Sequence, residues 1–382
     1  MDSVLIIAAE ASSTPYAQRL IQKLKSQYEN LHFFGVGSPA MEAAGFERMG
    51  KSEEMAVVGA AEIIHHYKAL KAVFNKIVEE AERRRPRVAV LMDYPEFNLM
   101  LAKKLSALGI PVVYYISPQI WAWRKGRIHT IKKYCKKVFL LFPFEIPFYE
   151  KHHVSHEFVG HPLLEDLDDK YLNPQWVANE RQRCGIAKDE IVLGLMPGSR
   201  RMELIQHFSL QLEVARRLSL EIPNLKIVIL VAPTFDRERL APYLEDFRCP
   251  YVILKKEPFE MISLTDFVLV ASGTATLMVG LLHKPMVIMY RMKALTALLA
   301  HLFVRGTKFF GLVNLILDKE VSPERFQSKA NPDEITRLMK ELIQSKEKAE
   351  QQRSDLRRLS SFLGQKGATE RVALGLREYL QK

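Results

Sequence analysis

Cysteine is scarce in this chain of 382 residues, and its three cysteines, Cys135, Cys184 and Cys249, lie far apart. An odd and dispersed set of thiols fits neither a disulfide framework nor a zinc site, and it favours a reducing compartment. The histidine pairs at 65–66 and 152–153 lack the i, i+4 spacing of helical metal ligands. We therefore expect no disulfide and no metal site.

Long apolar runs are also absent. The run at residues 4–9 is too short for the apolar core of a secretory signal, and no basic residues precede it. The later stretch 294–304 is interrupted by His301 and flanked by Lys293 and Arg305, whereas a span needs about 20 apolar residues. The sequence predicts neither a secretory signal nor a transmembrane helix, and a cytoplasmic location is the expectation.

Charge of one sign is in excess. Lys and Arg number 55 and Asp and Glu number 44, so the formal net charge is +11. The chain is 48% hydrophobic and 26% charged, values that exclude disorder of the whole chain. A positive excess of this size indicates an anionic partner: nucleic acid, a phosphate-bearing substrate or an anionic membrane surface.

Short β-branched runs alternate with longer helical patterns in two series, which is the signature of parallel α/β architecture. At about 150 residues per domain, the length also favours two domains. We predict two Rossmann-like doubly wound parallel-sheet domains facing a cleft, residues 1–164 and 165–331. The segment 332–382 is expected to be helical and to pack back on the first domain. The predicted strands are 4–8, 32–36, 88–92, 112–116, 138–142, 192–196, 227–231, 252–254, 267–271 and 286–289.

Polar turns follow two predicted strands of the second half, and ligands of parallel sheets bind at the carboxyl ends of strands. Gly198-Ser199-Arg200 and Ser272-Gly273-Thr274 each lead into a helix. Free backbone N–H groups at such a turn favour phosphate, and an arginine adds a bidentate contact. Either turn alone also fits an ordinary strand–helix connection, but two on one domain favour a phosphate site. Arg291 and Asn314 are further polar candidates.

Two carboxylates follow strands of the first half. Asp93 comes directly after the strand 88–92, and Glu10 follows the first strand. A carboxylate at a strand's carboxyl end suits a general base. The alternatives are an N-cap role for Asp93 in the helix that begins near Glu96, and for Glu10 either a substrate hydroxyl contact or a cap of the helix after Pro15.

A basic stretch with aromatics lies between Trp121 and Phe144, where seven basic residues and no acidic one occur. A stripe of leucines and Phe303 from Leu295 onwards has i, i+3, i+4, i+7, i+8 spacing. Both features fit binding to the surface of an anionic membrane. The alternatives are a solvated helix face over core tryptophans for the first and ordinary core packing for the second.

These segments, taken in order, resemble the lipid-A-disaccharide synthase family. Residues 117–124, SPQIWAWR, are similar to the family's S-P-x-x-W-A-W-R segment. The resemblance stays in register over about residues 3–330. Its other segments are 33–41, 141–145, 158–162, 195–200, 271–275 and 290–292.

The resemblance implies a GT-B glycosyltransferase that transfers 2,3-diacylglucosamine from its UDP derivative to 2,3-diacylglucosamine 1-phosphate (lipid X), without a metal or other cofactor. The products would be the β(1→6)-linked lipid A disaccharide 1-phosphate and UDP. It implies Asp93 as the catalytic base, with Glu10 as a second catalytic residue. It also implies a UDP site lined by Ser199, Arg200, Ser272, Gly273, Thr274, Arg291 and Asn314.

The partners that the resemblance implies are the acylated UDP-sugar, lipid X and the anionic inner-membrane surface of a Gram-negative bacterium. Both substrates carry acyl chains, which gives the basic and aromatic stretches a reason to meet that membrane. A homodimer is one allowed assembly, and no nucleic acid is expected, since no recognised nucleic-acid-binding module occurs.

Three positions depart from the family pattern. Thr14 replaces the acid that ends the family's first loop, Glu96 replaces an aspartate, and Met278 stands where a glutamate is expected to hydrogen bond the ribose. These departures leave two other hypotheses: a different UDP-sugar GT-B enzyme, such as another hexosaminyltransferase or a UDP-sugar 2-epimerase, and a non-catalytic lipid-binding paralogue. Asp93 and Arg200 are retained, which argues against a non-catalytic role.

Overall fold

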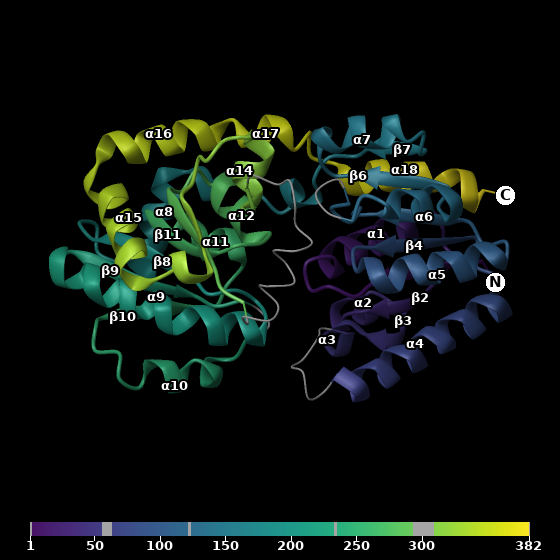
Figure 1. Ribbon diagram of the computed structural model, residues 1–382, viewed down its shortest axis with the longest axis horizontal. Coiled ribbons are helices and arrows are strands. Elements are labelled where there is room, and N and C mark those ends of the chain that lie inside the picture. The colour runs from purple at the N-terminus through teal and green to yellow at the C-terminus, as the bar shows by residue number, and fades with distance from the viewer. Residues whose placement is uncertain (1, 56–62, 121–123, 233–234, 293–308, 382) are drawn as a thin grey trace. The chain divides into compact units, whose positions relative to one another are not determined.

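The computed structural model describes residues 2–55, 63–120, 124–232, 235–292 and 309–381 (Figure 1). The chain folds into two compact units. Unit 1 comprises Met1–Glu165 and Leu363–Lys382, and unit 2 comprises Asp166–Phe362. The C-terminal segment 332–382, expected from the sequence to be helical and to pack back on the first domain, contributes helices to both units, and only residues from Leu363 onwards belong to unit 1.

Unit 1 contains a parallel sheet of seven strands in the order β3-β2-β1-β4-β5-β6-β7. All six residues of β1 are buried, as expected for a strand covered on both faces. The strands are β1 (Ser3–Ala8), β2 (His32–Gly37), β3 (Phe46–Lys51), β4 (Val88–Met92), β5 (Val112–Tyr115), β6 (Lys137–Leu140) and β7 (His156–Phe158).

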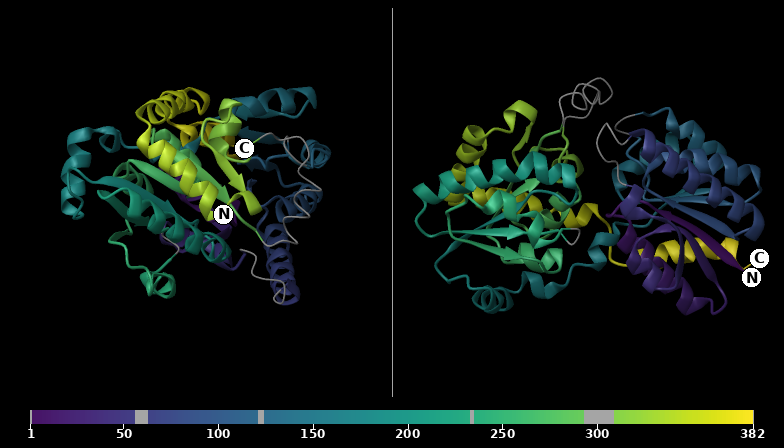
Figure 2. Two further views of the ribbon diagram at one scale, coloured as in Figure 1. Left: turned by 60° about the vertical axis from the view of Figure 1, so that its left-hand side comes forward. Right: turned by 90° about the horizontal axis from the view of Figure 1, so that it is seen from below.

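Helices cover both faces of this sheet (Figure 2). Leu5 and Ile7 of β1 share one core with Ile77, Leu101 and Ile131, which come from α4, α5 and α6. The C-terminal helix α18 packs against α1 and also contacts β4. The helices of unit 1 are α1 (Thr14–Gln27), α2 (Pro39–Ala43), α3 (Ser52–Met55), α4 (Ile63–Arg84), α5 (Pro95–Ala107), α6 (Arg127–Tyr134), α7 (Ile146–Lys151) and α18 (Ala368–Leu380).

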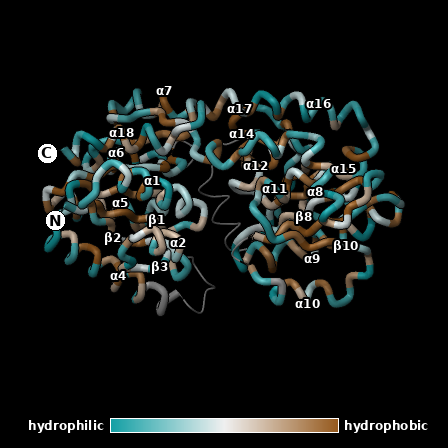
Figure 3. Tube along the Cα trace, turned by 180° about the vertical axis from the view of Figure 1, so that it is seen from behind, coloured by the Kyte–Doolittle hydropathy of each residue, from teal (hydrophilic) through white to brown (hydrophobic). Residues whose placement is uncertain are grey.

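Unit 2 contains a parallel sheet of six strands in the order β10-β9-β8-β11-β12-β13. The hydrophobic residues of both sheets lie at the centre of their units (Figure 3). The strands are β8 (Ile191–Met196), β9 (Leu225–Leu230), β10 (Tyr251–Leu254), β11 (Phe267–Ala271), β12 (Met286–Tyr290) and β13 (Glu324–Phe326).

The long helix α9 packs with α15 against this sheet, where Phe208 and Met339 join Leu193 and Leu269 in one core. The helix α12 contacts β11 and packs against α11, α14 and α16. The helices of unit 2 are α8 (Pro174–Arg183), α9 (Arg201–Glu221), α10 (Ala241–Leu244), α11 (Pro258–Ser263), α12 (Ala275–Leu281), α14 (Leu312–Leu317), α15 (Pro332–Gln344), α16 (Lys346–Arg357) and α17 (Leu359–Phe362).

The prediction of two parallel α/β sheets is confirmed, and each of the ten predicted strands is present within one or two residues. The sequence missed β3, β7 and β13, which all lie at sheet edges. An edge strand pairs with a neighbour on one side only and is less completely buried, and these three strands carry polar residues instead of continuous apolar runs. The three residues of β7, and likewise those of β13, are only half-buried.

The strand order reverses between β1 and β4 in unit 1 and between β8 and β11 in unit 2. At such a switch point the connections leave in opposite directions, which opens a crevice at the carboxyl ends of the two strands. Glu10 and Asp93 follow the first pair of strands, and the turns at Gly198 and Ser272 follow the second pair. The candidates chosen from the sequence therefore flank both switch points.

Candidate active site

The turn after β4 holds two consecutive non-glycine residues in the left-handed region, Asp93 with φ 51° and Tyr94 with φ 43°. Such backbone costs about 1–3 kcal/mol per residue and persists only where neighbouring groups hold it. The amide of Asn98 donates to the carbonyls of Met92 (3.1 Å) and Asp93 (2.7 Å), and the Tyr114 hydroxyl donates to that of Asp93 (2.6 Å). Both Asn98 and Tyr114 are fully buried, so the turn is rigidly supported.

The structure excludes one alternative for Asp93. The helix α5 begins at Pro95 and its N-cap position is Tyr94, which makes no side-chain cap hydrogen bond. The N-cap interpretation of Asp93 is therefore wrong. Glu96, on the first turn of this helix, forms ion pairs with Arg124 and Arg127. The basic stretch 121–144, which contains no acidic residue, is therefore paired with an acidic residue from outside it, Glu96.

Glu10 lies beside Asp93 because β1 and β4 are hydrogen-bonded neighbours, with Ala8 opposite Met92. The carbonyl of Glu10 accepts the N–H groups of Ser13 (3.0 Å) and Thr14 (3.2 Å) at the start of α1. Burial, followed by the negative charges of Glu10 and Glu96, raises the pKa of Tyr94. Both carboxylates are therefore close enough to Tyr94 to act on its hydroxyl electrostatically.

In unit 2, the turn after β8 is closed by Glu203. One carboxylate oxygen of Glu203 accepts the N–H groups of Ser199 (2.9 Å) and Arg200 (3.2 Å), as in a capping box. Gly198 has φ +116°, and a Cβ there would lie 2.3 Å from the same oxygen. The expectation of free N–H groups is therefore wrong for Ser199 and Arg200. The Arg200 side chain, 55% exposed and 3.8 Å from the Glu203 carboxylate, remains the cation of this turn.

The turn after β11 is more open. The N–H of Ser272 donates to the Met289 carbonyl, and its hydroxyl lies 3.5 Å from the Phe310 carbonyl. Gly273 is exposed with φ +151°, and no described atom lies within 4 Å of the place of a Cβ. Thr274 occupies the N-cap position of α12 without a side-chain cap bond. A ligand can approach the backbone here closely, as glycine permits.

Arg291 follows β12, and its Nε donates to the Ala330 carbonyl at 2.7 Å. The backbone N–H of Arg291 donates to Nε2 of His207, a fully buried histidine of α9. The other ring nitrogen of His207 lies 2.9 Å from the carbonyl of Pro197, in the turn after β8. Sequence analysis missed His207, since a lone histidine within an amphipathic helix carries no motif.

Asn314 lies in a buried hydrogen-bond network of unit 2. It is fully buried in α14; its amide donates to the Ser322 carbonyl and the Glu324 carboxylate, and its oxygen accepts the N–H groups of Val321 and Ser322. Two donors and two acceptors are the full capacity of this side chain. Glu324 in turn accepts the N–H groups of Phe310 and Gly311. Any contribution of Asn314 to a nucleotide site is therefore indirect, through the segment that it folds.

Replacing Asn314 by alanine is expected to lower the free energy of unfolding by about 2–4 kcal/mol, because several buried polar groups lose their partners. Urea denaturation measures this loss. The matched control is Asn179→Ala, an exposed asparagine of α8, expected to change stability by less than about 0.5 kcal/mol. An Asn314→Ala protein of normal stability with weakened UDP binding would instead indicate a direct nucleotide contact.

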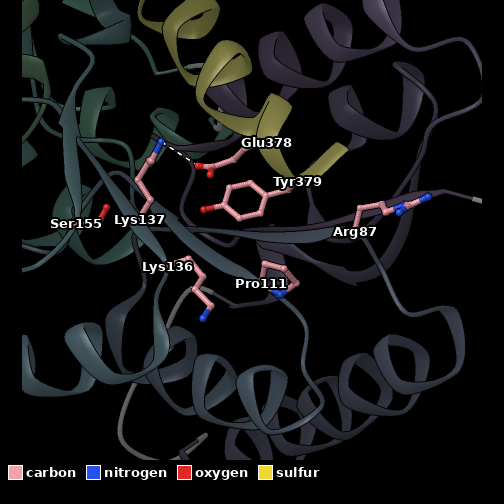
Figure 4. Close-up of a pocket in the computed structure, with 7 residues that line it drawn as sticks. All are labelled: Arg87, Pro111, Lys136, Lys137, Ser155, Glu378 and Tyr379. Carbon is pink, nitrogen blue, oxygen red and sulfur yellow. Dashed lines mark ion pairs between the residues drawn. The ribbon is translucent and has the colours of Figure 1, made fainter. Parts of the chain in front are cut away.

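A pocket of about 670 Å³ lies at the amino ends of the strands of unit 1, opposite the carboxyl ends that carry Asp93 and Glu10 (Figure 4). Its lining residues stand at the amino ends of β4 to β7 and on α18, away from Asp93. Lys137 is paired there with Glu378 at 3.1 Å, and Arg87 is paired with Asp2 at 2.8 Å. We do not assign this pocket to the active site. It is lined by Arg87, Pro111, Lys136, Lys137, Ser155, Glu378 and Tyr379.

No group of three or more His, Cys, Asp or Glu side chains in the described part of the chain has the arrangement of a metal site. No helix among the same residues combines the length and apolar character that crossing a membrane requires. The tryptophans at 121 and 123 and the apolar stripe 295–303 lie outside the described residues.

The fold is similar to solved structures over the whole chain. The S. aureus MnaA–UDP co-structure has a TM-score of 0.66 at 12% identity, covering 100% of this chain and 97% of that one. CalG4, the calicheamicin glycosyltransferase, has a TM-score of 0.61 at 14% identity, covering 100% and 98%. With polar turns at the switch points of two parallel sheets, this likeness defines a protein of the GT-B-like class.

The family follows from the sequence comparisons. Residues 4–374 match the family described as lipid-A-disaccharide synthetase. The chain is 35% identical over 377 residues to the lipid-A-disaccharide synthase of Myxococcus xanthus, covering 99% of this chain and 97% of that protein. It is 36% identical over 373 residues to that of Anaeromyxobacter dehalogenans, covering 97% and 96%. The chain belongs to the lipid-A-disaccharide synthase family and is a glycosyltransferase.

Proposed function

We propose that this enzyme transfers 2,3-diacylglucosamine from UDP-2,3-diacylglucosamine to the 6-hydroxyl of 2,3-diacylglucosamine 1-phosphate, releasing UDP. The donor sugar is α-linked and the product is β-linked, so the reaction inverts the anomeric centre. Inversion in one displacement requires a base for the acceptor hydroxyl and stabilisation of the departing diphosphate. The observation that carries the proposal is the family match over residues 4–374.

Asp93 is the proposed base. The supported left-handed turn after β4 fixes its backbone at the switch point of unit 1, where it suits proton removal from an acceptor hydroxyl. Glu10 lies on the neighbouring strand end and is proposed to orient the same hydroxyl.

The donor's UDP is proposed to bind at the switch point of unit 2. Arg200 supplies a cation for the diphosphate, and the open turn at Ser272, Gly273 and Thr274 admits phosphate or ribose oxygens close to its backbone. Arg291 lies at the end of the neighbouring strand β12. Met278, half-buried on α12, has only a weakly accepting thioether where a carboxylate was expected, so a strong ribose hydrogen bond has to come from other residues.

Arg200→Ala is expected to weaken UDP binding about 10- to 100-fold, since charge-assisted contacts contribute about 1.5–3 kcal/mol. The turn itself should persist, because Glu203 holds it through backbone N–H groups that alanine retains. Calorimetric titration with UDP measures the effect, and Arg201→Ala, on the adjacent exposed residue, is the control. Unchanged affinity in the Arg200 variant would remove this residue from the nucleotide site.

The enzyme is further proposed to work at the cytoplasmic surface of the inner membrane, bound peripherally. Both substrates are acylated, and the exposed lysines Lys125, Lys132 and Lys133 offer cations to anionic lipid. An enzyme bound to the membrane surface in this way reaches its acylated substrates without crossing the bilayer.

The activity is tested directly by incubating the purified protein with both lipid substrates in detergent micelles. Formation of the disaccharide 1-phosphate together with an equal amount of UDP is the expected result. UDP release without disaccharide would indicate hydrolysis or another acceptor, which favours a different UDP-sugar enzyme. Binding of the lipids without turnover would favour a non-catalytic paralogue.

A further inference from the structure

A single buried imidazole contacts both strand ends that carry the candidate arginines of the donor site. The His207 ring, fully buried on α9, has Nδ1 2.9 Å from the Pro197 carbonyl. Its Nε2 lies 3.0 Å from the backbone nitrogen of Arg291 and 3.1 Å from the backbone carbonyl oxygen of the same residue. Pro197 precedes the turn that carries Ser199 and Arg200.

One neutral tautomer makes two of these three contacts as hydrogen bonds, the ones to the Pro197 carbonyl and to the Arg291 backbone N–H. With the proton on Nδ1, the ring donates to the Pro197 carbonyl and accepts the N–H of Arg291 at Nε2. Burial lowers the pKa of His207, which favours this neutral ring. Its charged neighbours are Glu203 and Arg291, and the Tyr290 ring packs against it at 5.1 Å between centroids. The imidazole therefore acts as a neutral bridge with one donor and one acceptor.

The bridge spans strands that do not touch. In the sheet of unit 2, β11 lies between β8 and β12, so no ladder hydrogen bond joins the two strand ends that His207 contacts. Gln211, one turn further along α9, links the neighbouring strands β8 and β11. Its amide donates to the carbonyls of Met196 (3.1 Å) and Leu269 (3.2 Å). One face of α9 thus contacts three strands, β8 and β12 at their carboxyl ends and β11 at its middle residue, Leu269.

We propose that His207 is a positioning residue of the donor site: its neutral ring fixes the turn of Arg200 relative to Arg291, so that both can meet one diphosphate. This inference rests on the proposed UDP site. A diphosphate is compact, so two cations serve it together only if the distance between their strand ends is held constant.

Two conservative variants separate the two halves of the bridge. In His207→Asn, the amide nitrogen takes the place of Nδ1 and can donate to Pro197, but the side chain does not reach Arg291. In His207→Gln, the amide oxygen takes the place of Nε2 and can accept from Arg291, but the donor to Pro197 is lost. His207→Leu removes both contacts and keeps an apolar side chain in the core. The matched control is His32→Asn, an exposed histidine at the start of β2 in unit 1.

The Asn and Gln variants are each expected to raise the Kd for UDP about 5- to 10-fold, the effect of losing one buried hydrogen bond. His207→Leu should raise it further, to about the product of the two effects. In the transfer assay the KM for the UDP-sugar should rise by similar factors, while the KM for the acceptor stays unchanged. The His32→Asn protein should match the wild type in all three quantities.

Thermal unfolding of each variant distinguishes positioning from general packing. If the Asn and Gln variants are no better than Leu, and UDP affinity follows the loss of thermal stability, the ring is a packing residue and the inference is overturned. If all His207 variants bind UDP normally while Arg200→Ala binds it weakly, the inference also fails and the proposed function stands. If Arg200→Ala binds UDP normally as well, Arg200 does not contact the nucleotide, and the part of the proposed donor site on which this inference rests is wrong.

Discussion

Replacing Asp93 by asparagine is expected to lower the rate of disaccharide formation by about 10²–10⁴-fold, the usual contribution of a general base. Asparagine has the same shape but does not accept the proton of the acceptor hydroxyl. The described bonds that support this turn, from Asn98 and Tyr114, go to the Asp93 carbonyl and survive the change. Asparagine also tolerates the left-handed backbone of residue 93 better than alanine does.

The assay compares the Asp93→Asn protein with the wild type for disaccharide formation and for UDP affinity. UDP affinity should be unchanged, because the proposed UDP contacts all lie in unit 2 and Asp93 lies in unit 1. The control is Glu96→Gln, three residues further along the chain on the exposed first turn of α5, which should keep most of the activity. If Asp93→Asn retained nearly full activity, the base would be another carboxylate, Glu10 or Glu96, and Glu10→Gln would be measured next and compared with Glu96→Gln.

The internal strands of both sheets could be predicted from the sequence because burial on two faces demands continuous apolar, β-branched runs, such as Val88–Met92 and Phe267–Ala271. The edge strand β3 could not, since its residues Phe46–Lys51 mix exposed charges with buried apolar groups. The division of the C-terminal helices between the units was also beyond the sequence. Helical periodicity shows which face of α18 is apolar, but not which sheet that face covers.

The candidate site could be predicted where position alone decides, at residues directly after buried strands. Asp93 and Glu10 were found in this way, and the strand order then placed them at a switch point. Groups that act through tertiary hydrogen bonds gave no signal. His207 bonds the backbone of Arg291, 84 residues away, and such a contact forms only in the folded chain. The bonds of Glu203 to the turn of Arg200 and of Asn314 to Glu324 are closer in sequence, but no motif that we used points to them.

The basic surface of α6 and the segment before it is the second feature with a large expected effect. Lys125, Lys132 and Lys133 are exposed and, within the described residues, form no ion pair, whereas Arg124 shares Glu96 with Arg127. Each Lys or Arg near an anionic surface contributes roughly 1 kcal/mol, and salt screens this attraction within a Debye length. The surface should therefore bind anionic vesicles in a salt-dependent manner.

Changing Arg124, Lys125, Lys132 and Lys133 together to glutamine should lower binding to vesicles of anionic phospholipid by roughly 10²–10³-fold at low salt, with the Arg124 contribution reduced by its pairing to Glu96. UDP affinity should not change, since these residues belong to unit 1. Vesicle flotation at increasing salt measures the effect. The matched control neutralises four cations of α16, Lys346, Lys348, Arg353 and Arg357, of which Lys348, Arg353 and Arg357 are paired with Glu341 or Glu350. Two results would contradict this prediction: no binding of the wild type to anionic vesicles at low salt, or equal binding by both quadruple variants. Either result would show that this basic surface is a solvated helix face and that another part of the chain binds the acylated substrates.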